Sequence, residues 1–398
     1  MFTKKLIPML NKPKLIRITT VPKSLGGLLK GQLKFMNTFY EVIAVSGESE
    51  ILNKFSEEEG VRVIPVTMTR TISPIKDLVA LFKLVRIFKK ENPFIVHTHT
   101  PKAGFLGMFA AWLTNVPLRL HTVAGLPLLE EKGIKRKILN IIEKVTYKLA
   151  TNIYPNSFGL YNIILQNNFT DKHKLKVLGN GSSNGIDTSF FDSSKVTDQC
   201  KSKLKKELGI ASEDFVYIYI GRLVKAKGIN ELIEAFKILN KNYNNTKLIL
   251  VGGFEHNLDP LKKETYNEIR ENKSIIHVGY QSDVRPYLTI SDVLTFPSYR
   301  EGFPNVPMQA GAMGIPSIVT DINGCNEIIE DGKNGLIIEP KSVSSLQNAM
   351  LRLLKDADLR ECLASRAREV IVSRYEQKYF WAELLNEYKR LESEILDK

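Results

Sequence analysis

Two basic residues, Arg222 and Lys227, stand between a β-branched, aromatic segment and a segment with helical periodicity. The stretch GRLVKAKG (221–228) begins with Gly221 and ends with Gly228, where the helix is expected to begin. Backbone N–H groups at a helix start attract phosphate, and Arg and Lys add charge-assisted hydrogen bonds. The pattern therefore predicts a diphosphate site, and a turn with solvated basic residues is the alternative. It matches neither the Walker A motif nor the dinucleotide-binding glycine motif.

A carboxylate, Glu301, occupies a comparable place further along the chain. The strand-like segment 291–298 leads into a polar loop with Glu301 and Gly302, and a helix is expected to begin around 305–308. A carboxylate beside a helix start accepts hydrogen bonds from sugar hydroxyls, and a glycine lets the backbone approach a ligand closely. These residues fit a sugar site, while a helix-capping role for Glu301 fits the same pattern.

Histidines and glycines follow strand-like segments in the first half of the chain. His97 and His99, in VHTHT, share one face of a strand. A metal would need a third ligand, and none is apparent. His121, in PLRLHTV, fits either a group that lines a catalytic cleft or a core histidine. Gly26 and Gly27 fit a turn between a strand and a helix that needs positive φ.

Alternating strands and helices must position these residues. Strand-like runs alternate with helical patterns, such as the one over 74–92, which places Leu78 and Phe82 on an apolar helix face. The alternation predicts βαβ units and parallel sheets, whose ligands bind outside the carboxyl ends of the strands. The loops expected to carry the site of the first half are therefore 21–27, 97–104, 121–127 and 156–159.

The stretch 178–198 concentrates Gly, Ser, Asn and Asp without periodicity, which marks a linker. We predict an α/β protein with two Rossmann-like, doubly wound domains that face a cleft. The N-terminal domain is expected over 1–187 and the C-terminal domain over 188–375. A C-terminal helix over 376–398 is expected to pack back on the N-terminal domain.

The charge of the chain is uneven. The 398 residues carry a net charge of +13, and residues 1–187 hold 27 Lys and Arg against 13 Asp and Glu, whereas 188–398 hold 29 against 30. A basic half suggests an anionic partner, such as a membrane surface, a phosphorylated substrate or nucleic acid, or else lysine-rich solvated faces. The basic, amphipathic pattern over 131–150 fits a helix on an anionic membrane, or one that buries its apolar face in a core.

Several features that the sequence lacks indicate where in the cell the protein is expected. No stretch approaches ~18 uninterrupted apolar residues, so no membrane-spanning helix is expected. Residues 1–18 are basic but lack an apolar core and a cleavage site, so we expect no secretory signal. Cys200, Cys325 and Cys362 are far apart, which fits a reducing cytoplasm. We expect a cytoplasmic protein that lies peripherally at the inner face of the cell membrane.

Taken together, three motifs resemble glycosyltransferase family 4. They are a strand followed by GRLVKAKG (215–228), then SYREGFPN (298–305), then GIPSIVTDINGCNEIIEDGKNGLI (314–337). HTHTPKAG (97–104) and NGID (184–187) match more loosely. Enzymes of that family have the two-Rossmann GT-B fold and transfer sugars from nucleotide sugars with retention of configuration. The resemblance therefore implies a GT-B fold in which 1–187 form the acceptor-side domain and 188–375 the nucleotide-sugar-binding domain. The resemblance covers essentially the whole chain and is strongest over 215–340.

The resemblance implies a role for each matching residue. Arg222 and Lys227 would hold the donor diphosphate beside Gly221, and Glu301 would contact the donor sugar. Gln309 stands where the family usually has a second Glu for the ribose hydroxyls, so that bond would lose its charge assistance. The further implied residues are His121 in the catalytic cleft, Gly279 and Tyr280 at the nucleobase, Gly302, Phe303, Pro304 and Asn305 beside the donor sugar, Glu327 in support, and Gly26, Gly27 and His99 in an acceptor or phosphate loop.

The activity implied by the resemblance is a retaining transfer from a nucleotide-diphosphate sugar, expected to be a UDP-sugar. The expected acceptor is a polyprenyl-diphosphate-linked glycan in bacterial surface-polysaccharide biosynthesis. No metal is expected, because Arg222, Lys227 and a helix dipole would balance the diphosphate, and the D-x-D at 356–358 falls in an expected surface helix. Two alternatives stay open: a nucleotide-sugar 2-epimerase, and a basic nucleic-acid-binding protein, against which the basic half shows no recognised binding motif.

Overall fold

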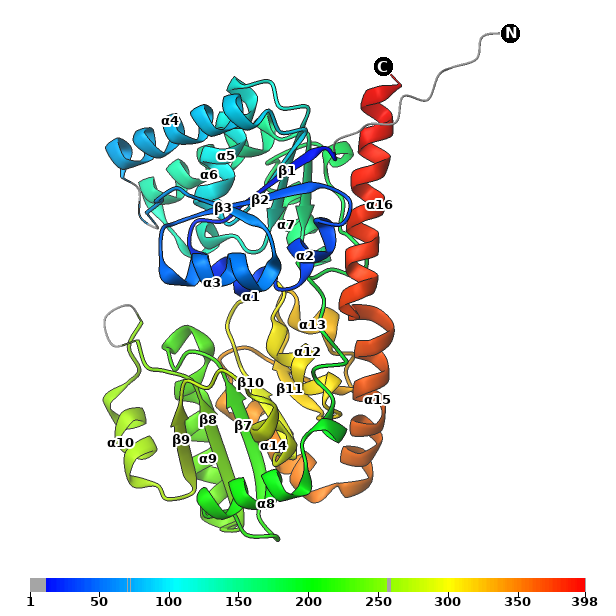
Figure 1. Cartoon of the computed structure of the whole chain (residues 1–398). Helices are drawn as coiled ribbons and strands as arrows, with labels where there is room; N and C mark the ends of the chain where they lie inside the picture. The colour runs from blue at the N-terminus through cyan, green and yellow to red at the C-terminus, as the bar shows by residue number, and fades with distance from the viewer. Residues whose placement is uncertain (1–11, 70, 72, 256–258, 398) are drawn as a thin grey trace. The chain divides into compact units, whose positions relative to one another are not determined.

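The computed structural model describes residues 12–69, 71, 73–255 and 259–397, so most of the basic segment 1–18 lies outside the described residues (Figure 1). The chain divides into two compact units. Unit 1 comprises Met1–Asn184 and Phe380–Lys398, and unit 2 comprises Gly185–Tyr379. The chain thus passes from unit 1 to unit 2 after Asn184 and returns to unit 1 at Phe380. The sequence had predicted these two boundaries after 187 and after 375. Within the described part, no helix is both long and apolar enough to cross a membrane.

Unit 1 is built on a six-stranded parallel sheet with the order β3-β2-β1-β4-β5-β6. The first three strands extend the sheet in one direction and the next three in the other. The topological switch point, where loops of such sheets diverge and ligands bind, therefore lies between β1 and β4. The strands are β1 (Lys14–Ile18), β2 (Glu41–Ser46), β3 (Arg62–Pro65), β4 (Ile95–His99), β5 (Leu118–Val123) and β6 (Asn152–Pro155).

Helices cover both faces of this sheet because successive side chains of a strand point to opposite faces. Ile16 of β1 packs in one core with α4, α5, α6 and α7. Leu15 packs in a second core with α1, α2, α3 and α16. The helices are α1 (Pro22–Leu28), α2 (Gln32–Met36), α3 (Glu50–Glu59), α4 (Pro74–Glu91), α5 (Pro101–Leu113), α6 (Gly133–Leu149), α7 (Phe158–Gln166) and α16 (Gln377–Leu396), the last entering unit 1 at Phe380.

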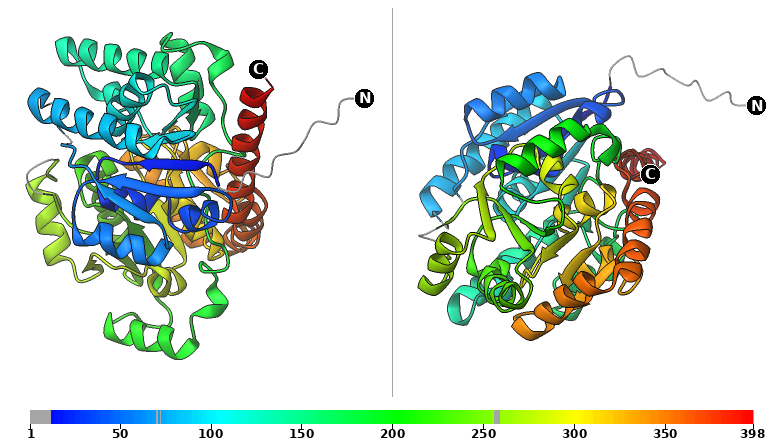
Figure 2. Two further views of the ribbon diagram at one scale, coloured as in Figure 1. Left: turned by 45° about the horizontal axis from the view of Figure 1, so that its top comes forward. Right: turned by 90° about the horizontal axis from the view of Figure 1, so that it is seen from below.

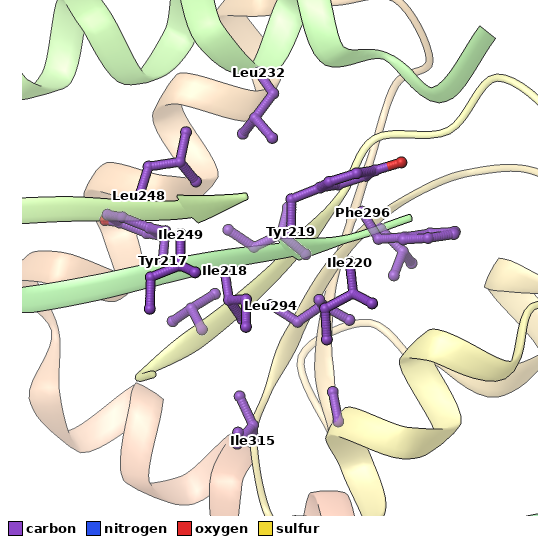
Figure 3. Close-up of a cluster of buried hydrophobic side chains, with 14 of the residues drawn as sticks. Tyr217, Ile218, Tyr219, Ile220, Leu232, Leu248, Ile249, Leu294, Phe296 and Ile315 are labelled. Atoms are coloured by element: carbon purple, nitrogen blue, oxygen red, sulfur yellow. The ribbon is translucent and has the colours of Figure 1, made fainter. Parts of the chain in front are cut away.

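Unit 2 repeats the same plan, with the parallel sheet order β12-β11-β10-β7-β8-β9. Its switch point lies between β7 and β10. Figure 3 shows the centre of its core, where Tyr217 and Tyr219 of β7 lie on one face and Ile218 and Ile220 on the other. The strands are β7 (Phe215–Ile220), β8 (Thr246–Val251), β9 (Ile275–Gly279), β10 (Val293–Phe296), β11 (Ser317–Thr320) and β12 (Gly335–Ile338).

In unit 2 as in unit 1, helices connect successive strands of a parallel sheet. The predicted α/β fold with two doubly wound sheets is therefore confirmed. The helices of unit 2 are α8 (Asp198–Glu207), α9 (Ile229–Asn242), α10 (Lys263–Glu271), α11 (Arg285–Thr289), α12 (Asn305–Ala312), α13 (Cys325–Ile328), α14 (Val343–Lys355) and α15 (Ala357–Tyr375).

Two local predictions were wrong. The expected loop 21–27 is helix α1, and neither Gly26 nor Gly27 has a positive φ, so the turn alternative for these glycines fails. Pro22 is compatible with the first turn of that helix because the missing N–H has no helical acceptor there. The D-x-D at 356–358 lies at a junction of two helices instead of inside one, and the Asp356 carboxylate caps α15 by accepting from the N–H of Leu359 at 2.9 Å.

A buried arginine holds α16 against the sheet of unit 1. Arg17 of β1 is fully buried, and its Nη2 donates to Gln32 Oε1 at 2.6 Å. Its Nη1 donates to the Tyr388 hydroxyl of α16 at 3.1 Å, and that hydroxyl also lies 2.6 Å from Nδ1 of His97. One hydroxyl thus serves two buried polar groups on neighbouring strands.

We predict that Tyr388→Phe lowers the free energy of unfolding by about 1–3 kcal/mol, because it leaves a buried N–H of Arg17 and the buried Nδ1 of His97 without their partner. Urea unfolding followed by circular dichroism measures the change. Tyr379→Phe is the matched control, since the Tyr379 side chain is 48% exposed and should tolerate the loss of its hydroxyl. Equal stability of the two variants would show that the Arg17–Tyr388 bond is dispensable.

Candidate functional site

Lys227 and Glu301 meet at the switch point of unit 2. Lys227 ends the turn Lys225–Lys227 that follows β7, and Glu301 lies in the loop that follows β10. Because β7 and β10 are neighbouring parallel strands, their carboxyl ends lie at the same edge of the sheet. Lys227 Nζ forms an ion pair and hydrogen bond with Glu301 Oε1, and the two side chains are only 18% and 15% exposed. The strand order thus brings together two residues that the sequence separates widely.

Gly228 explains how closely these two loops approach each other. Its φ is +70°, and a Cβ there would overlap with the carbonyl oxygen of Pro297. The loops are also joined by a backbone bond from the N–H of Tyr299 to the oxygen of Ala226 at 3.0 Å. As predicted, α9 begins directly after this glycine, at Ile229. Gly228 therefore combines a left-handed turn with the space that the second loop needs.

Arg222 stands at the start of the same loop, directly after β7, and pairs with a different carboxylate. Its Nη1 lies 2.8 Å from Oε2 of Glu255, in the loop after β8, and its side chain is 58% exposed. The loops after β7 and β8 also touch through their backbones, since the N–H of Leu223 donates to the oxygen of Gly253 at 2.8 Å. Glu255 was not predicted. The available signal was an acidic residue just after the Gly-Gly that ends a strand.

Hydrogen bonds to its backbone hold the Glu301 loop in place, while the Glu301 carboxylate pairs with Lys227. Asn323, which the sequence analysis also missed, donates from Nδ2 to the backbone oxygens of Glu301 at 3.0 Å and Gly302 at 2.8 Å. Helix α12 begins at Asn305 after Pro304, without a side-chain cap. The capping alternative for Glu301 is therefore wrong. Phe303 is buried and packs against the ring of Tyr375 at 5.4 Å between centroids.

The other predicted donor residues lie at the same edge of the sheet. Gly279 ends β9 with a φ of +69°, and its carbonyl accepts from the N–H of Gly252 at 2.8 Å. Tyr280 follows it with a side chain that is 82% exposed. Gln309 is half-buried on α12, one turn after Asn305. The backbone oxygen of Glu327 accepts a hydrogen bond from the Tyr375 hydroxyl at 2.7 Å.

Cys325 lies beneath the site as the first residue of α13. It is fully buried, and burial raises the pKa of its thiol well above the usual value, with the negative charge of Glu301 adding to the rise. Its thiol is therefore held in the neutral form below the ion pair.

The predicted pair of histidines in unit 1 shares a strand face, as expected, but is buried. The rings of His97 and His99 stack with centroids 4.7 Å apart, and each side chain is about 1% exposed. His99 Nε2 lies 2.7 Å from Nη2 of Arg17, and His97 Nε2 lies 2.8 Å from the Thr122 hydroxyl. Burial, and then the charge of Arg17, hold the pKa of both histidines well below 6.5. Both rings are therefore neutral parts of the network that holds α16.

His121 points to the opposite face of the sheet and lies in the core. It is 2% exposed, its Nδ1 lies 2.8 Å from the Thr98 hydroxyl, and Gly104 of α5 packs so closely that a Cβ would overlap with its ring. Burial lowers the pKa of His121 to about 4. The structure thus favours the core alternative over a place in a catalytic cleft. In the part of the chain that the structure describes, no three His, Cys, Asp or Glu side chains gather as metal ligands.

Comparisons with known proteins agree with this geometry. The family model of "Glycosyl transferase 4-like domain" matches residues 40–181, and that of "Glycosyl transferases group 1" matches 201–370. The capsular polysaccharide biosynthesis glycosyltransferase CapM of Staphylococcus aureus is 34% identical over 378 residues, which cover 94% of this chain and 96% of CapM. The UDP-Gal:alpha-D-GlcNAc-diphosphoundecaprenol alpha-1,3-galactosyltransferase of Escherichia coli is 29% identical, with 85% of this chain and 86% of that enzyme covered.

Among solved structures, Anabaena HepE in complex with UDP and glucose is similar, with a TM-score of 0.80 and 20% identity over 95% of this chain and 100% of HepE. WaaG, a glycosyltransferase involved in lipopolysaccharide biosynthesis, gives a TM-score of 0.71 at 16% identity over 92% of this chain and 97% of WaaG. The two Rossmann-like units are thus those of a glycosyltransferase with the GT-B fold. The chain belongs to glycosyltransferase family 4, and the resemblance of its motifs to that family is confirmed.

We predict that Gly228→Ala destabilises the protein by at least about 2 kcal/mol more than Gly209→Ala, since core overlap is among the costly classes of substitution. Gly209 is the matched control because it has nearly the same backbone, with φ of +64°, but open space around its Cβ position. Both variants carry the left-handed strain, and only Gly228→Ala meets the backbone of Pro297. Urea unfolding gives the difference, and equal destabilisation would contradict the close contact between the two loops.

Proposed function

We propose that this glycosyltransferase transfers a sugar from a UDP-sugar to a polyprenyl-diphosphate-linked glycan, with retention of the anomeric configuration. The observation that carries the proposal is the Lys227–Glu301 pair at the switch point of unit 2, with Arg222 at the start of the loop that also carries Lys227. Support comes from the relatives: the name of the E. coli enzyme specifies a UDP-sugar donor and a diphosphoundecaprenol acceptor, and CapM is named for capsular polysaccharide biosynthesis.

On the donor side, the diphosphate takes Arg222 and Lys227 as its cationic partners, beside the backbone of Gly221. Both cations are already paired with carboxylates, so donor binding exchanges Glu255 and Glu301 for phosphate oxygens. The exchange leaves the Glu301 carboxylate to accept hydrogen bonds from sugar hydroxyls. The remaining donor contacts that we propose are Gly302, Phe303, Pro304 and Asn305 beside the sugar, Gln309 at the ribose, and Gly279 and Tyr280 at the nucleobase.

The chemical step follows from this arrangement. The acceptor hydroxyl oxygen bonds to the anomeric carbon on the face from which UDP leaves, while the bond from that carbon to the β-phosphate oxygen breaks. The hydroxyl proton passes to the leaving phosphate oxygen, so the step needs no enzymic base on the opposite face. Lys227 and Arg222 stabilise the charge that develops on the diphosphate. A core position of His121 is compatible with this scheme.

The acceptor is assigned to unit 1, at the carboxyl edge of its sheet. Gly26 and Gly27 are exposed there on α1, with open space around both. His99 cannot touch the acceptor where it lies, and it acts by fixing Arg17 and the β4 end beneath that edge. The basic first half supports a position at an anionic membrane surface, where lipid-linked acceptors reside.

The decisive assay incubates the protein with UDP-sugars and polyprenyl-diphosphate-linked acceptors and follows the products by mass spectrometry and proton NMR. The proposal expects an α-linked product from an α-linked UDP-sugar. A β-linked product would overturn the retaining mechanism, and the appearance of an epimerised free nucleotide sugar without acceptor would favour the 2-epimerase.

We predict that Arg222→Ala and Lys227→Ala each weaken UDP binding by about 1.5–3 kcal/mol, because each removes a charge-assisted bond to the diphosphate. Isothermal titration calorimetry with UDP measures the loss. Lys225→Ala is the matched control, since Lys225 lies in the same turn with an exposed side chain and should leave the affinity unchanged. Unchanged affinity in both test variants would reject the diphosphate assignment.

Glu301→Gln should lower kcat about 100-fold, which corresponds to roughly 2.7 kcal/mol of transition-state stabilisation. The reason is that the carboxylate bonds the sugar, and an amide bonds it without charge assistance. Affinity for UDP, which lacks the sugar, should not weaken in this variant. If kcat stays at the wild-type value, Glu301 has no role at the sugar.

Activity should survive EDTA, because two cationic side chains balance the diphosphate. Asp358→Asn, which removes the exposed carboxylate of the D-x-D while keeping the Asp356 cap, should also keep full activity. Loss of activity on chelation, with recovery on adding Mg²⁺ or Mn²⁺, would contradict metal independence.

A further inference from the structure

The short turn that ends with Lys227 is held at its middle residue from two sides. The N–H of Ala226 donates to Oδ2 of Asp259 at 2.7 Å, and the carbonyl oxygen of Ala226 accepts from the N–H of Tyr299 at 3.0 Å. The backbone oxygen of Asp259 also accepts from the N–H of Lys225 at 3.3 Å. Both polar backbone groups of the residue next to Lys227 thus have partners outside the turn.

The residues that follow Asp259 fix its position. They lead into α10, which packs beside α9 (Figures 1 and 2). Leu261 is buried in the core of unit 2. The N–H of Lys262 donates to Oδ1 of Asn230 at 3.0 Å, and the Thr265 hydroxyl donates to the same oxygen at 2.8 Å. Because Asn230 is a buried residue of α9, the backbone that carries Asp259 is tied to the helix that begins directly after the turn.

Tyr299 holds the turn from the opposite side and is itself tied to α9. Its hydroxyl donates to Oε2 of Glu231, in the first turn of that helix, at 2.6 Å. Burial, and then the hydrogen bond to Glu231, raise the pKa of Tyr299, and the negative charge of Asp259 adds to the rise. The hydroxyl therefore stays protonated and remains a donor. The Ala226 peptide groups thus lie between two supports, of which the Asp259 carboxylate is the one that a substitution can remove.

Two carboxylates that follow β8 in the chain thus contact the loop after β7 in different ways. Glu255 pairs with the guanidinium of Arg222, which is a group that the diphosphate needs in the proposed site. Asp259 instead bonds the backbone beside Lys227. Glu255 therefore competes with the donor, whereas the bond of Asp259 can persist while the donor is bound. The two acidic residues should have opposite effects on donor binding.

We propose that Asp259 is a positioning residue of the donor site, which holds the backbone of Ala226 and thereby sets the place of the Lys227 ammonium group. The carboxylate also occupies the N–H of Ala226, so a phosphate at this turn meets the ammonium group instead of that N–H. A charge-assisted bond to a phosphate oxygen needs a short distance, and a small displacement of the cation weakens it. This inference rests on the proposed function, because it takes Lys227 as a cation that binds the diphosphate.

The test is isothermal titration calorimetry of the full-length protein with UDP. Asp259→Ala removes the bond to Ala226 and should weaken UDP binding about tenfold. Asp259→Asn keeps an acceptor oxygen and should bind UDP nearly as tightly as wild type. The matched control is Asp331→Ala, because Oδ1 of Asp331 accepts from the N–H of Ile337 at 2.8 Å on the edge strand β12. It removes the same kind of bond and should leave UDP affinity unchanged.

Two further measurements separate positioning from a general effect of charge or of stability. Glu255→Gln should tighten UDP binding about two- to fivefold, because it removes a competing carboxylate from an exposed ion pair. In a protein that already carries Lys227→Ala, adding Asp259→Ala should cause no further loss, since Asp259 acts through Lys227. Circular dichroism checks that each variant is folded.

Several outcomes would overturn the positioning role. They are tighter UDP binding by Asp259→Ala, a loss in Asp259→Asn as large as in Asp259→Ala, and a full tenfold loss in the Lys227→Ala background. The same titrations distinguish this proposal from the proposed function. Unchanged affinity in Lys227→Ala rejects the diphosphate site, whereas a loss in Lys227→Ala with none in Asp259→Ala rejects only the role of Asp259.

Discussion

The donor site depends on one constraint, the meeting of the β7 and β10 loops at the switch point of unit 2. Parallel pairing of these strands sets their carboxyl ends side by side, and Gly228 lets the loops touch where any side chain would collide with Pro297. Asn323 holds the backbone of the second loop through two hydrogen bonds. Lys227 and Glu301 then have little freedom to part, because the backbones that carry them are fixed. The ion pair is thus a consequence of strand order and of one glycine.

The pairing of charges has a consequence for a reaction that begins and ends with a diphosphate. Each cation at the site has a carboxylate partner, Lys227 with Glu301 and Arg222 with Glu255. Without such partners, a partly buried cation would be costly to desolvate. A diphosphate must compete with these carboxylates for the two cations. Part of the electrostatic attraction between the proposed site and the donor is therefore offset. The same carboxylates are available to take the cations back when UDP leaves.

Unit 1 uses the same strand order for a different purpose. Its switch point carries Arg17, His97 and His99, but these side chains are buried and bind Gln32 and Tyr388. The network holds α16 and leaves the exposed part of the edge to α1. Helices α4 and α6 of this unit expose apolar side chains, such as Phe82 and Ile134. The two units are therefore alike in topology and different in chemistry, which agrees with the uneven charge along the sequence.

The sequence predicted the fold and the residues of the donor motifs, because periodicity and turn residues are local signals. It could not predict the Lys227–Glu301 contact, which depends on strand order. Nor could it predict Glu255 and Asn323, because each acts on a loop that is distant in the sequence. His121 was ambiguous, since burial of a histidine depends on Gly104 of another element. For helices α4 and α6 the sequence could not predict which apolar side chains are exposed, because an apolar stripe has the same spacing whether it faces a core or solvent.

The proposed donor site is tested most directly by a crystal structure of the protein with an intact UDP-sugar bound. Phosphate oxygens are expected within hydrogen-bond distance of Lys227 Nζ and the Arg222 guanidinium, with the Glu301 carboxylate turned from Lys227 to the sugar hydroxyls. A bound UDP-sugar that leaves the Lys227–Glu301 pair intact, with its diphosphate held by other residues, would contradict the proposed site.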